Sequence, residues 1–92
     1  MAITRIQIQS IINALRRFGA KRILLFGSAA ETPEKARDID IAVEGIPLKR
    51  LLDADVAISD ILAMPCDLVS SEENPDFYRI IRNYGKVLYE EG

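Results

Sequence analysis

The sequence predicts an α/β or α+β fold in which helices pack on one small sheet. Two observations carry this prediction: apolar residues recur at three-and-four spacing in three segments, and short apolar or alternating segments lie between them. A third observation sets the scale, because 92 residues suffice for one hydrophobic core and leave no room for a second. We therefore expect a single domain over residues 1–92, in the order α-β-loop-β-α-β-α-β.

The first two elements are a helix and a strand. Apolar residues at helical spacing, followed by the helix-ending residue Gly19, predict a helix over residues 5–18. These apolar residues are Ile8, Ile11, Ile12, Leu15 and Phe18. The continuous apolar run 23–26 then predicts a strand buried on both faces, and this strand ends at Gly27 and Ser28.

A loop and a second strand follow. Residues 29–37 are small or polar and contain a proline, which predicts a loop with at most one helical turn at its start. Residues 38–44 alternate with period two, so Ile39, Ile41 and Val43 point to one face and the other residues of the segment to the opposite face. This alternation predicts a strand with one apolar face.

The second half of the chain continues the alternation of helices and strands. A helix over residues 48–63 begins after Pro47 and ends before Pro65. Its apolar stripe consists of Leu51, Ala54, Ile58 and Ile61, with Leu48, Leu52 and Leu62 along the flank. Residues 66–70 then predict a short strand.

A third long helix and a last strand complete the chain. Asn74 and Pro75 are typical of a helix start, and Gly85 is typical of a helix end. Between them, helical spacing predicts a buried face made of Phe77, Ile80, Ile81 and Tyr84. Tyr78 falls off this face, and we expect it to be exposed. Residues 86–89 predict a fourth short strand.

The composition excludes several classes of function. The sequence has no histidine, so imidazole catalysis and histidine metal sites are excluded. The single cysteine, Cys66, excludes an internal disulfide and a zinc cage, and it fits the reducing conditions of the cytoplasm. The net charge of −2 gives no reason to expect DNA or an anionic membrane as a partner. No uncharged run is long enough to span a bilayer, and the first residues lack the pattern of a signal peptide, so we expect a cytoplasmic domain.

Basic residues gather near the first helix. They are Arg5, Arg16, Arg17, Lys21 and Arg22. Because acidic residues outnumber basic ones in the chain, 14 to 12, a solvated surface is the simplest interpretation of this cluster.

One constellation of residues points to chemistry. Gly27 and Ser28 follow a buried strand, where glycine permits a sharp turn and where amides and a hydroxyl can hold phosphate. Asp38 and Asp40 lie two residues apart on a strand, so they share a face and repel each other unless a cation lies between them. Asp67 on the third strand would add another carboxylate. Since Mg²⁺ prefers oxygen ligands and takes some of them from substrate phosphates, the pattern predicts a magnesium and phosphate site.

These motifs resemble the minimal nucleotidyltransferases of the DNA polymerase β superfamily over almost the whole chain. The resemblance is carried by Leu25-Phe26-Gly27-Ser28, by Asp38-Ile39-Asp40-Ile41-Ala42-Val43, by Cys66-Asp67-Leu68-Val69 and by the ending from Ile80 to Glu90. It implies a nucleotidyltransferase fold with a small mixed sheet of three to four strands. It also implies that Gly27 and Ser28 hold a nucleoside triphosphate and that Asp38 and Asp40 bind Mg²⁺. By the same resemblance, Asp67 helps to hold metal and accepts the proton of the attacking hydroxyl.

The resemblance further implies a partner and a reaction. Prokaryotic members are often antitoxins of HEPN ribonuclease toxins, and some silence the toxin by transferring AMP to one of its tyrosines. We therefore expect a Mg²⁺-dependent nucleotidyltransferase that moves a nucleoside monophosphate, AMP from ATP, to a hydroxyl of a HEPN toxin. A homo-oligomer and a hetero-oligomer are both compatible with the sequence.

The alternative is a catalytically lapsed domain that neutralises its partner by contact alone. Departures from the family pattern keep this alternative open. Ala29, Ala30 and Glu31 stand where family members commonly have an arginine, and Arg37 replaces the usual serine before Asp38. A cation at Arg37 would supply the positive charge that the residues after Ser28 lack.

Overall fold

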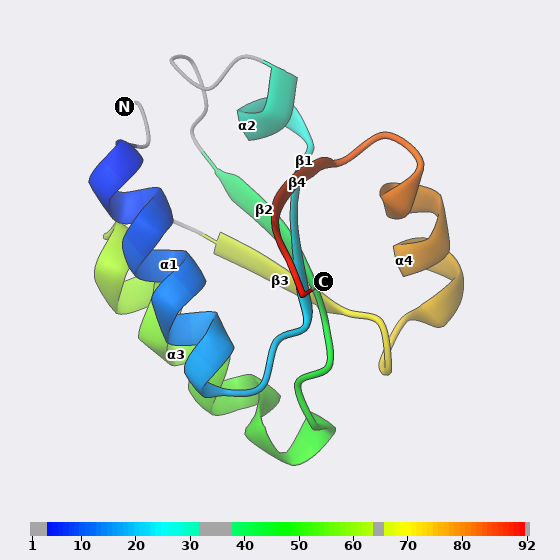
Figure 1. Ribbon diagram of the computed structural model, residues 1–92, viewed down its shortest axis with the longest axis horizontal. Coiled ribbons are helices and arrows are strands. Elements are labelled where there is room, and N and C mark those ends of the chain that lie inside the picture. The colour runs from blue at the N-terminus through cyan, green and yellow to red at the C-terminus, as the bar shows by residue number, and fades with distance from the viewer. Residues whose placement is uncertain (1–3, 32–37, 64–65, 92) are drawn as a thin grey trace.

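The fold is a four-stranded sheet with helices on both faces, as the computed structural model in Figure 1 shows. The structure describes residues 4–31, 38–63 and 66–91. The elements in chain order are α1 (Arg5–Arg17), β1 (Arg22–Phe26), α2 (Ser28–Glu31), β2 (Ile39–Glu44), α3 (Leu48–Leu62), β3 (Cys66–Ser70), α4 (Pro75–Arg82) and β4 (Lys86–Glu90). The predicted fold class is confirmed, and the predicted boundaries lie within one residue of the observed ones except at the end of α4, which ends at Arg82 and not directly before Gly85. Arg37 and the loop around it lie outside the described residues.

The sheet is mixed, with the strand order β3-β2-β1-β4. Strand β1 runs antiparallel to both of its neighbours, β2 and β4, whereas β2 and β3 run parallel. Parallel neighbours need a crossover connection, and α3 supplies it here. Because β2 and β3 run in the same direction, their first residues lie next to each other at the same end of the two strands.

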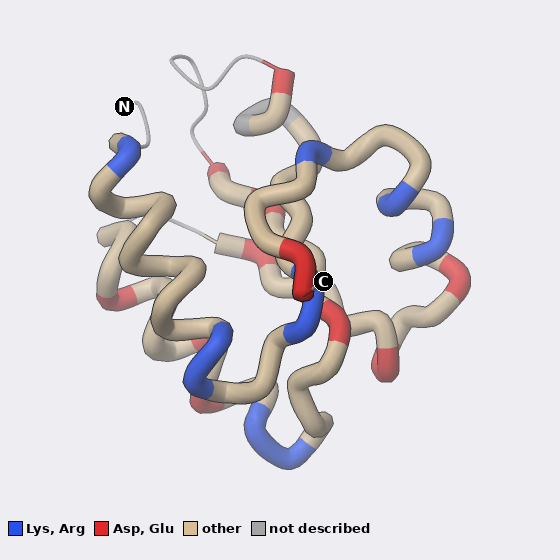
Figure 2. Tube along the Cα trace, in the orientation of Figure 1, with Lys and Arg blue, Asp and Glu red and all other residues tan. Residues whose placement is uncertain are grey.

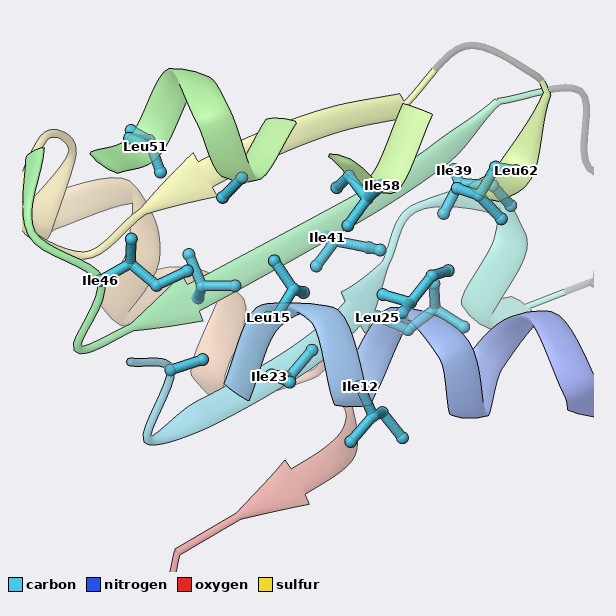
Figure 3. Close-up of a cluster of buried hydrophobic side chains, with 14 residues drawn as sticks. Ile12, Leu15, Ile23, Leu25, Ile39, Ile41, Ile46, Leu51, Ile58 and Leu62 are labelled. Atoms are coloured by element: carbon cyan, nitrogen blue, oxygen red, sulfur yellow. The ribbon is translucent and has the colours of Figure 1, made fainter. Parts of the chain in front are cut away.

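One face of the sheet is covered by α1 and α3, which lie side by side on it in Figure 1. The buried cluster on this face is almost entirely aliphatic, and Figure 3 shows how its side chains meet between the helices and the sheet. Ile23 and Leu25 of β1 and Ile39 and Ile41 of β2 form the floor, and all four are at most 3% exposed. Burial of this apolar surface is the main source of stability.

The opposite face is covered in part by α4. Its buried cluster is small and consists of Leu24, Ala42, Tyr78 and Ile81. Ala42 is fully buried, so β2 has apolar cover on both faces, and the prediction of a single apolar face for this strand is wrong. The period-two pattern gave a wrong prediction because alanine is only weakly apolar. The small side chain of Ala42 nevertheless lets α4 approach the sheet.

Helix α4 uses a different face from the predicted one. Tyr78 is 4% exposed, which contradicts its predicted exposure, whereas Phe77, Ile80 and Tyr84 are 45%, 53% and 64% exposed. Of the four residues predicted to be buried, Ile81 is the one that is. Apolar and aromatic residues occupy more than one side of this short helix, so their spacing alone does not tell which side meets the sheet.

Arg22 also departs from the predicted basic surface. Its guanidinium pairs with Glu44 at 3.2 Å and with Glu90 at 2.9 Å, on the two strands that flank β1. The other members of the basic cluster are exposed, as a solvated surface requires. They are Arg5, Arg16, Arg17 and Lys21. Figure 2 shows how Arg and Lys are distributed along the chain.

Candidate functional site

Asp40 and Asp67 lie side by side across the parallel pair of strands. Asp40 of β2 is in register with Asp67 of β3, and on the other side it is in register with Phe26 of β1. Residues in register project from the same face of a sheet, so the two carboxylates share a face. This is the face that α4 covers in part. Asp40 lies two residues before Ala42 on β2, so both side chains point to the same face, and Ala42 belongs to the cluster under α4.

The environment of Asp40 disfavours its negative charge. Burial raises the pKa of the Asp40 carboxyl, and the charge of Asp67, a hydrogen bond to Asp67 and the charge of Asp38 raise it further. Asp38 itself is exposed and comes directly before β2. Carboxylates this close are stabilised by a proton or by a cation placed between them. The arrangement therefore favours binding of a positive charge at Asp40.

Two features favour glycine at position 27, at the end of β1. Its φ of +72° is in the left-handed region that glycine adopts without strain. In addition, a Cβ atom at this position would collide with the carboxylate of Asp40. The turn at Gly27 leads directly into α2, of which Ser28 is the first residue. The glycine thus lets the backbone turn pass immediately beside Asp40. A ligand bound to that carboxylate would also contact the backbone of the turn.

A cavity of about 490 Å³ opens beside the two carboxylates. Its lining residues are Phe26, Asp40, Asp55, Cys66, Asp67, Leu68, Val69 and Phe77. The rings of Phe26 and Phe77 meet edge to face, with centroids 6.0 Å apart, and join the sheet to α4. The cavity is large enough for part of a small ligand, and it combines apolar walls with acidic groups.

Asp55 was missed by the sequence analysis. It lies on α3, four residues after Leu51 and three before Ile58, so helical spacing places it near the apolar stripe. One of its carboxylate oxygens is buried and has no hydrogen-bond partner among the described residues. A charged residue next to the inner stripe of a helix was the signal that could have identified it.

Cys66 is chemically inert in this setting. Burial raises the pKa of its thiol to about 12, and the negative charges of Asp55, Asp67 and Asp40 contribute in the same direction. The thiol therefore stays protonated at neutral pH and is a poor nucleophile. Cys66 serves as a wall of the cavity.

The acidic residues fit a magnesium ion that arrives with a phosphate ligand better than a cage made by protein alone. In residues 4–31, 38–63 and 66–91, no three Asp, Glu or Cys side chains converge as a metal-binding group. Asp40 and Asp67 do adjoin, and Asp38 is near enough to affect the pKa of Asp40. Mg²⁺ usually takes one or two carboxylates and completes its octahedron with water and substrate phosphates. The roles of Gly27 and Ser28 in nucleotide binding stay predictions, as do the metal roles of the three aspartates.

The sequence of the chain matches a known family over most of its length. The family model described as "Polymerase beta, Nucleotidyltransferase" matches residues 9–92. The chain belongs to this family. The matched region of this nucleotidyltransferase domain contains Gly27, Ser28 and all three candidate aspartates. A search of curated proteins finds no match.

Solved structures of toxin–antitoxin complexes have the same fold. A chain of a toxin–antitoxin complex with AMP-PNP is 24% identical, with a TM-score of 0.75 over 90% of this nucleotidyltransferase domain and 73% of that chain. A chain from a mutant MntA–HpeT complex is 25% identical, with a TM-score of 0.74 over 89% and 71% of the two chains. A chain from the complex of a tri-AMPylated Shewanella oneidensis HEPN toxin with an MNT antitoxin is 23% identical, with a TM-score of 0.73 over 96% and 73%.

The described part of the domain contains no helix long and apolar enough to cross a membrane.

Proposed function

We propose that this domain is a Mg²⁺-dependent nucleotidyltransferase that transfers AMP from ATP to a hydroxyl of a HEPN-type toxin and thereby acts as its antitoxin. The observation that carries the proposal is the adjacency of Asp40 and Asp67 beside the Gly27 turn in a member of the nucleotidyltransferase family. The similar complexes with AMP-PNP and with an AMPylated HEPN toxin support the choice of nucleotide and partner.

The chemical step is a displacement at phosphorus. The oxygen of the acceptor hydroxyl forms a bond to the α-phosphorus of ATP, the bond from that phosphorus to its bridging oxygen breaks, and pyrophosphate leaves with the electron pair. Asp67, which is exposed at the cavity, accepts the proton of the hydroxyl. The backbone turn at Gly27 and Ser28 holds the triphosphate, so the reacting groups are positioned before the step.

Magnesium would be held by Asp38, Asp40 and Asp67 together with phosphate oxygens. When bound, it supplies neutralisation of the phosphate charge. The chain's own residues contribute the negative charge that attracts it, because the Asp40 carboxylate lies beside Asp67 and close to Asp38.

The experiment is transfer of label from ATP that carries ³²P at the α-position to the HEPN-type protein of the same genome. The proposal predicts label on the partner with the wild-type domain and loss of label with Asp40→Asn together with Asp67→Asn. The matched control removes two exposed acids of α3, Asp53→Ala with Asp60→Ala, and keeps the transfer. Absence of label under conditions in which wild-type domain binds ATP–Mg²⁺ and the partner contradicts the proposal.

The second candidate function is neutralisation of the partner by contact alone. The observation that favours it is the described segment directly after Ser28, where Ala29, Ala30 and Glu31 provide no positive charge for the phosphates. The same labelling experiment separates the two functions. A partner that loses its toxicity without gaining label identifies contact as the mechanism.

A further inference from the structure

Helix α4 exposes a stripe of large apolar side chains. Phe77 and Ile80 lie three residues apart on one side of α4, and Tyr84 follows the end of the helix at Arg82; these three residues are here called the α4 flank. They are 45%, 53% and 64% exposed, while Tyr78 and Ile81 of the same helix contact the sheet. A contiguous apolar patch of this kind is typical of a surface that binds another protein.

The α4 flank is continuous with the candidate site. Phe77 stands at its beginning and also lines the cavity that contains Asp40 and Asp67. The ring of Phe77 rests on Phe26, whose strand position is in register with Asp40. A protein seated on the flank would therefore reach the edge of the cavity, where the α-phosphate of a bound nucleotide has to meet the acceptor.

A second exposed apolar stripe lies on α3, but it faces another cavity. Leu48, Leu52 and Val56 are 52%, 73% and 54% exposed. Leu48 and Leu52 line a cavity of about 290 Å³ that includes neither Asp40 nor Asp67. This cavity shares Asp55 and Leu68 with the cavity at Asp40 and Asp67, but no residue of the exposed α3 stripe lines the latter, whereas Phe77 of α4 does.

A second copy of this chain is a poor occupant of the α4 flank. In a two-fold symmetric dimer the same patch faces itself, so the two cavities would lie close together. Each cavity carries Asp40, Asp55 and Asp67, and the chain has a net charge of −2. These like charges would repel each other across the contact.

We propose that the α4 flank is the docking surface for the partner protein that carries the acceptor hydroxyl. The partner would cover Ile80 and Tyr84 with apolar side chains of its own and place its hydroxyl at the cavity beside Phe77. This inference rests on the proposed function, which requires a protein acceptor, and it adds the surface that selects that acceptor.

The test is calorimetric binding of the HEPN-type protein of the same genome to three forms of the domain. Ile80→Asp with Tyr84→Asp places two charges in the α4 flank and is expected to weaken binding at least about 30-fold, as for the centre of a protein interface. Leu52→Asp with Val56→Asp makes the same change on α3 and is expected to alter the dissociation constant less than about 3-fold. Neither pair lines the cavity at Asp40 and Asp67, so both variants keep the ATP–Mg²⁺ affinity of the wild type, which verifies that they are folded.

The other outcomes overturn the docking proposal, the proposed function or both. Wild-type affinity of the α4 variant, or equal losses in both variants, shows that the partner does not choose this surface. A wild-type dimer in sedimentation that the α4 variant dissociates assigns the flank to a second copy. If the wild type does not bind the HEPN-type protein at all, both proposals fail. If binding depends on the flank but no label is transferred, docking stands and the proposed AMP transfer fails.

Discussion

The two faces of the sheet differ in what their side chains do. On the α1–α3 face, the side chains of Ile23, Leu25, Ile39 and Ile41 are buried in one continuous aliphatic cluster. On the other face α4 covers a small cluster, and the uncovered part of the sheet presents Asp40, with Asp67 beside it, to a cavity. One face is closed and apolar, whereas the other is open and acidic.

This difference shows how a small domain accommodates charged groups without losing its core. An ionised carboxylate is costly to bury unless it has a partner, so the acids lie where no helix covers the sheet. The apolar face supplies most of the burial that stabilises the domain. The open face contributes less to stability. On this face Asp40 has a raised pKa, and the cavity beside it leaves room for a ligand.

The largest expected effect is on the closed face. Ile41→Ala removes a fully buried side chain from the large cluster and should lower the free energy of unfolding by about 3–4 kcal/mol. Ile81→Ala makes the same change in the small cluster under α4 and should cost about 2 kcal/mol, because the partly open surroundings can relax. Urea denaturation of both variants measures the difference. Equal or reversed costs would show that the two faces contribute alike.

The next effect concerns the turn between the closed core and the open site. Gly27→Ala should cost about 1–3 kcal/mol and abolish ATP–Mg²⁺ binding, because the new Cβ collides with the carboxylate of Asp40 and the backbone has a φ of +72°. Gly19→Ala is the control. Its φ is +110°, but its Cβ would meet the carbonyl oxygen of Gly45 at a normal 3.5 Å, so stability falls and binding stays. Denaturation and calorimetry check the two variants, and retained binding in Gly27→Ala would refute the close contact.

A smaller effect depends on pH and tests the acidity of the open face. The folded domain binds a proton at Asp40 more tightly than the unfolded chain does, because the pKa of Asp40 is raised. The resulting penalty is absent below the pKa of an unfolded aspartate and grows as the pH rises through the raised pKa. Asp40→Asn should therefore stabilise the domain at pH 7 in the absence of divalent ions and give no gain in acid. Urea midpoints across this pH range would contradict the account if the variant were less stable at pH 7.

The smallest effect is expected at Tyr78, on the α4-covered face. Its hydroxyl is buried and has no partner of hydrogen-bond geometry in the described part of the chain, although burial raises its pKa and Arg22 and Glu44 are close enough to affect that pKa. Tyr78→Phe should therefore change the free energy of unfolding by less than about 0.5 kcal/mol. A loss well above 1 kcal/mol in urea denaturation would show that the hydroxyl is hydrogen-bonded in solution.

Sequence periodicity predicted the elements well because it reports which residues share a face. It placed Asp38 and Asp40 together and gave the boundaries of β3, where Asp67 lies. It could not tell which side of α4 meets the sheet, since the buried side and the exposed side each carry an aromatic residue and an isoleucine: Tyr78 and Ile81 against Phe77 and Ile80.

The spacing of residues along the sequence does not tell which strands pair in the sheet. That Asp40 lies in register with Asp67 depends on the parallel pairing of β2 and β3, which α3 makes possible and which only the family resemblance implied. The position of Asp55 next to the inner stripe of α3 marks it as unusual, but its local sequence does not show that Asp40 and Asp67 line the same cavity.

The central claim is that the open face binds a nucleotide with magnesium through its aspartates. Titration of ATP–Mg²⁺ into the wild-type domain and into Asp38→Ala with Asp40→Ala is the most direct measurement. The account predicts that the double variant folds and loses Mg²⁺-dependent binding, while the control pair Asp53→Ala and Asp60→Ala binds as the wild type does. Binding of ATP–Mg²⁺ by the Asp38 and Asp40 variant with wild-type affinity would contradict it.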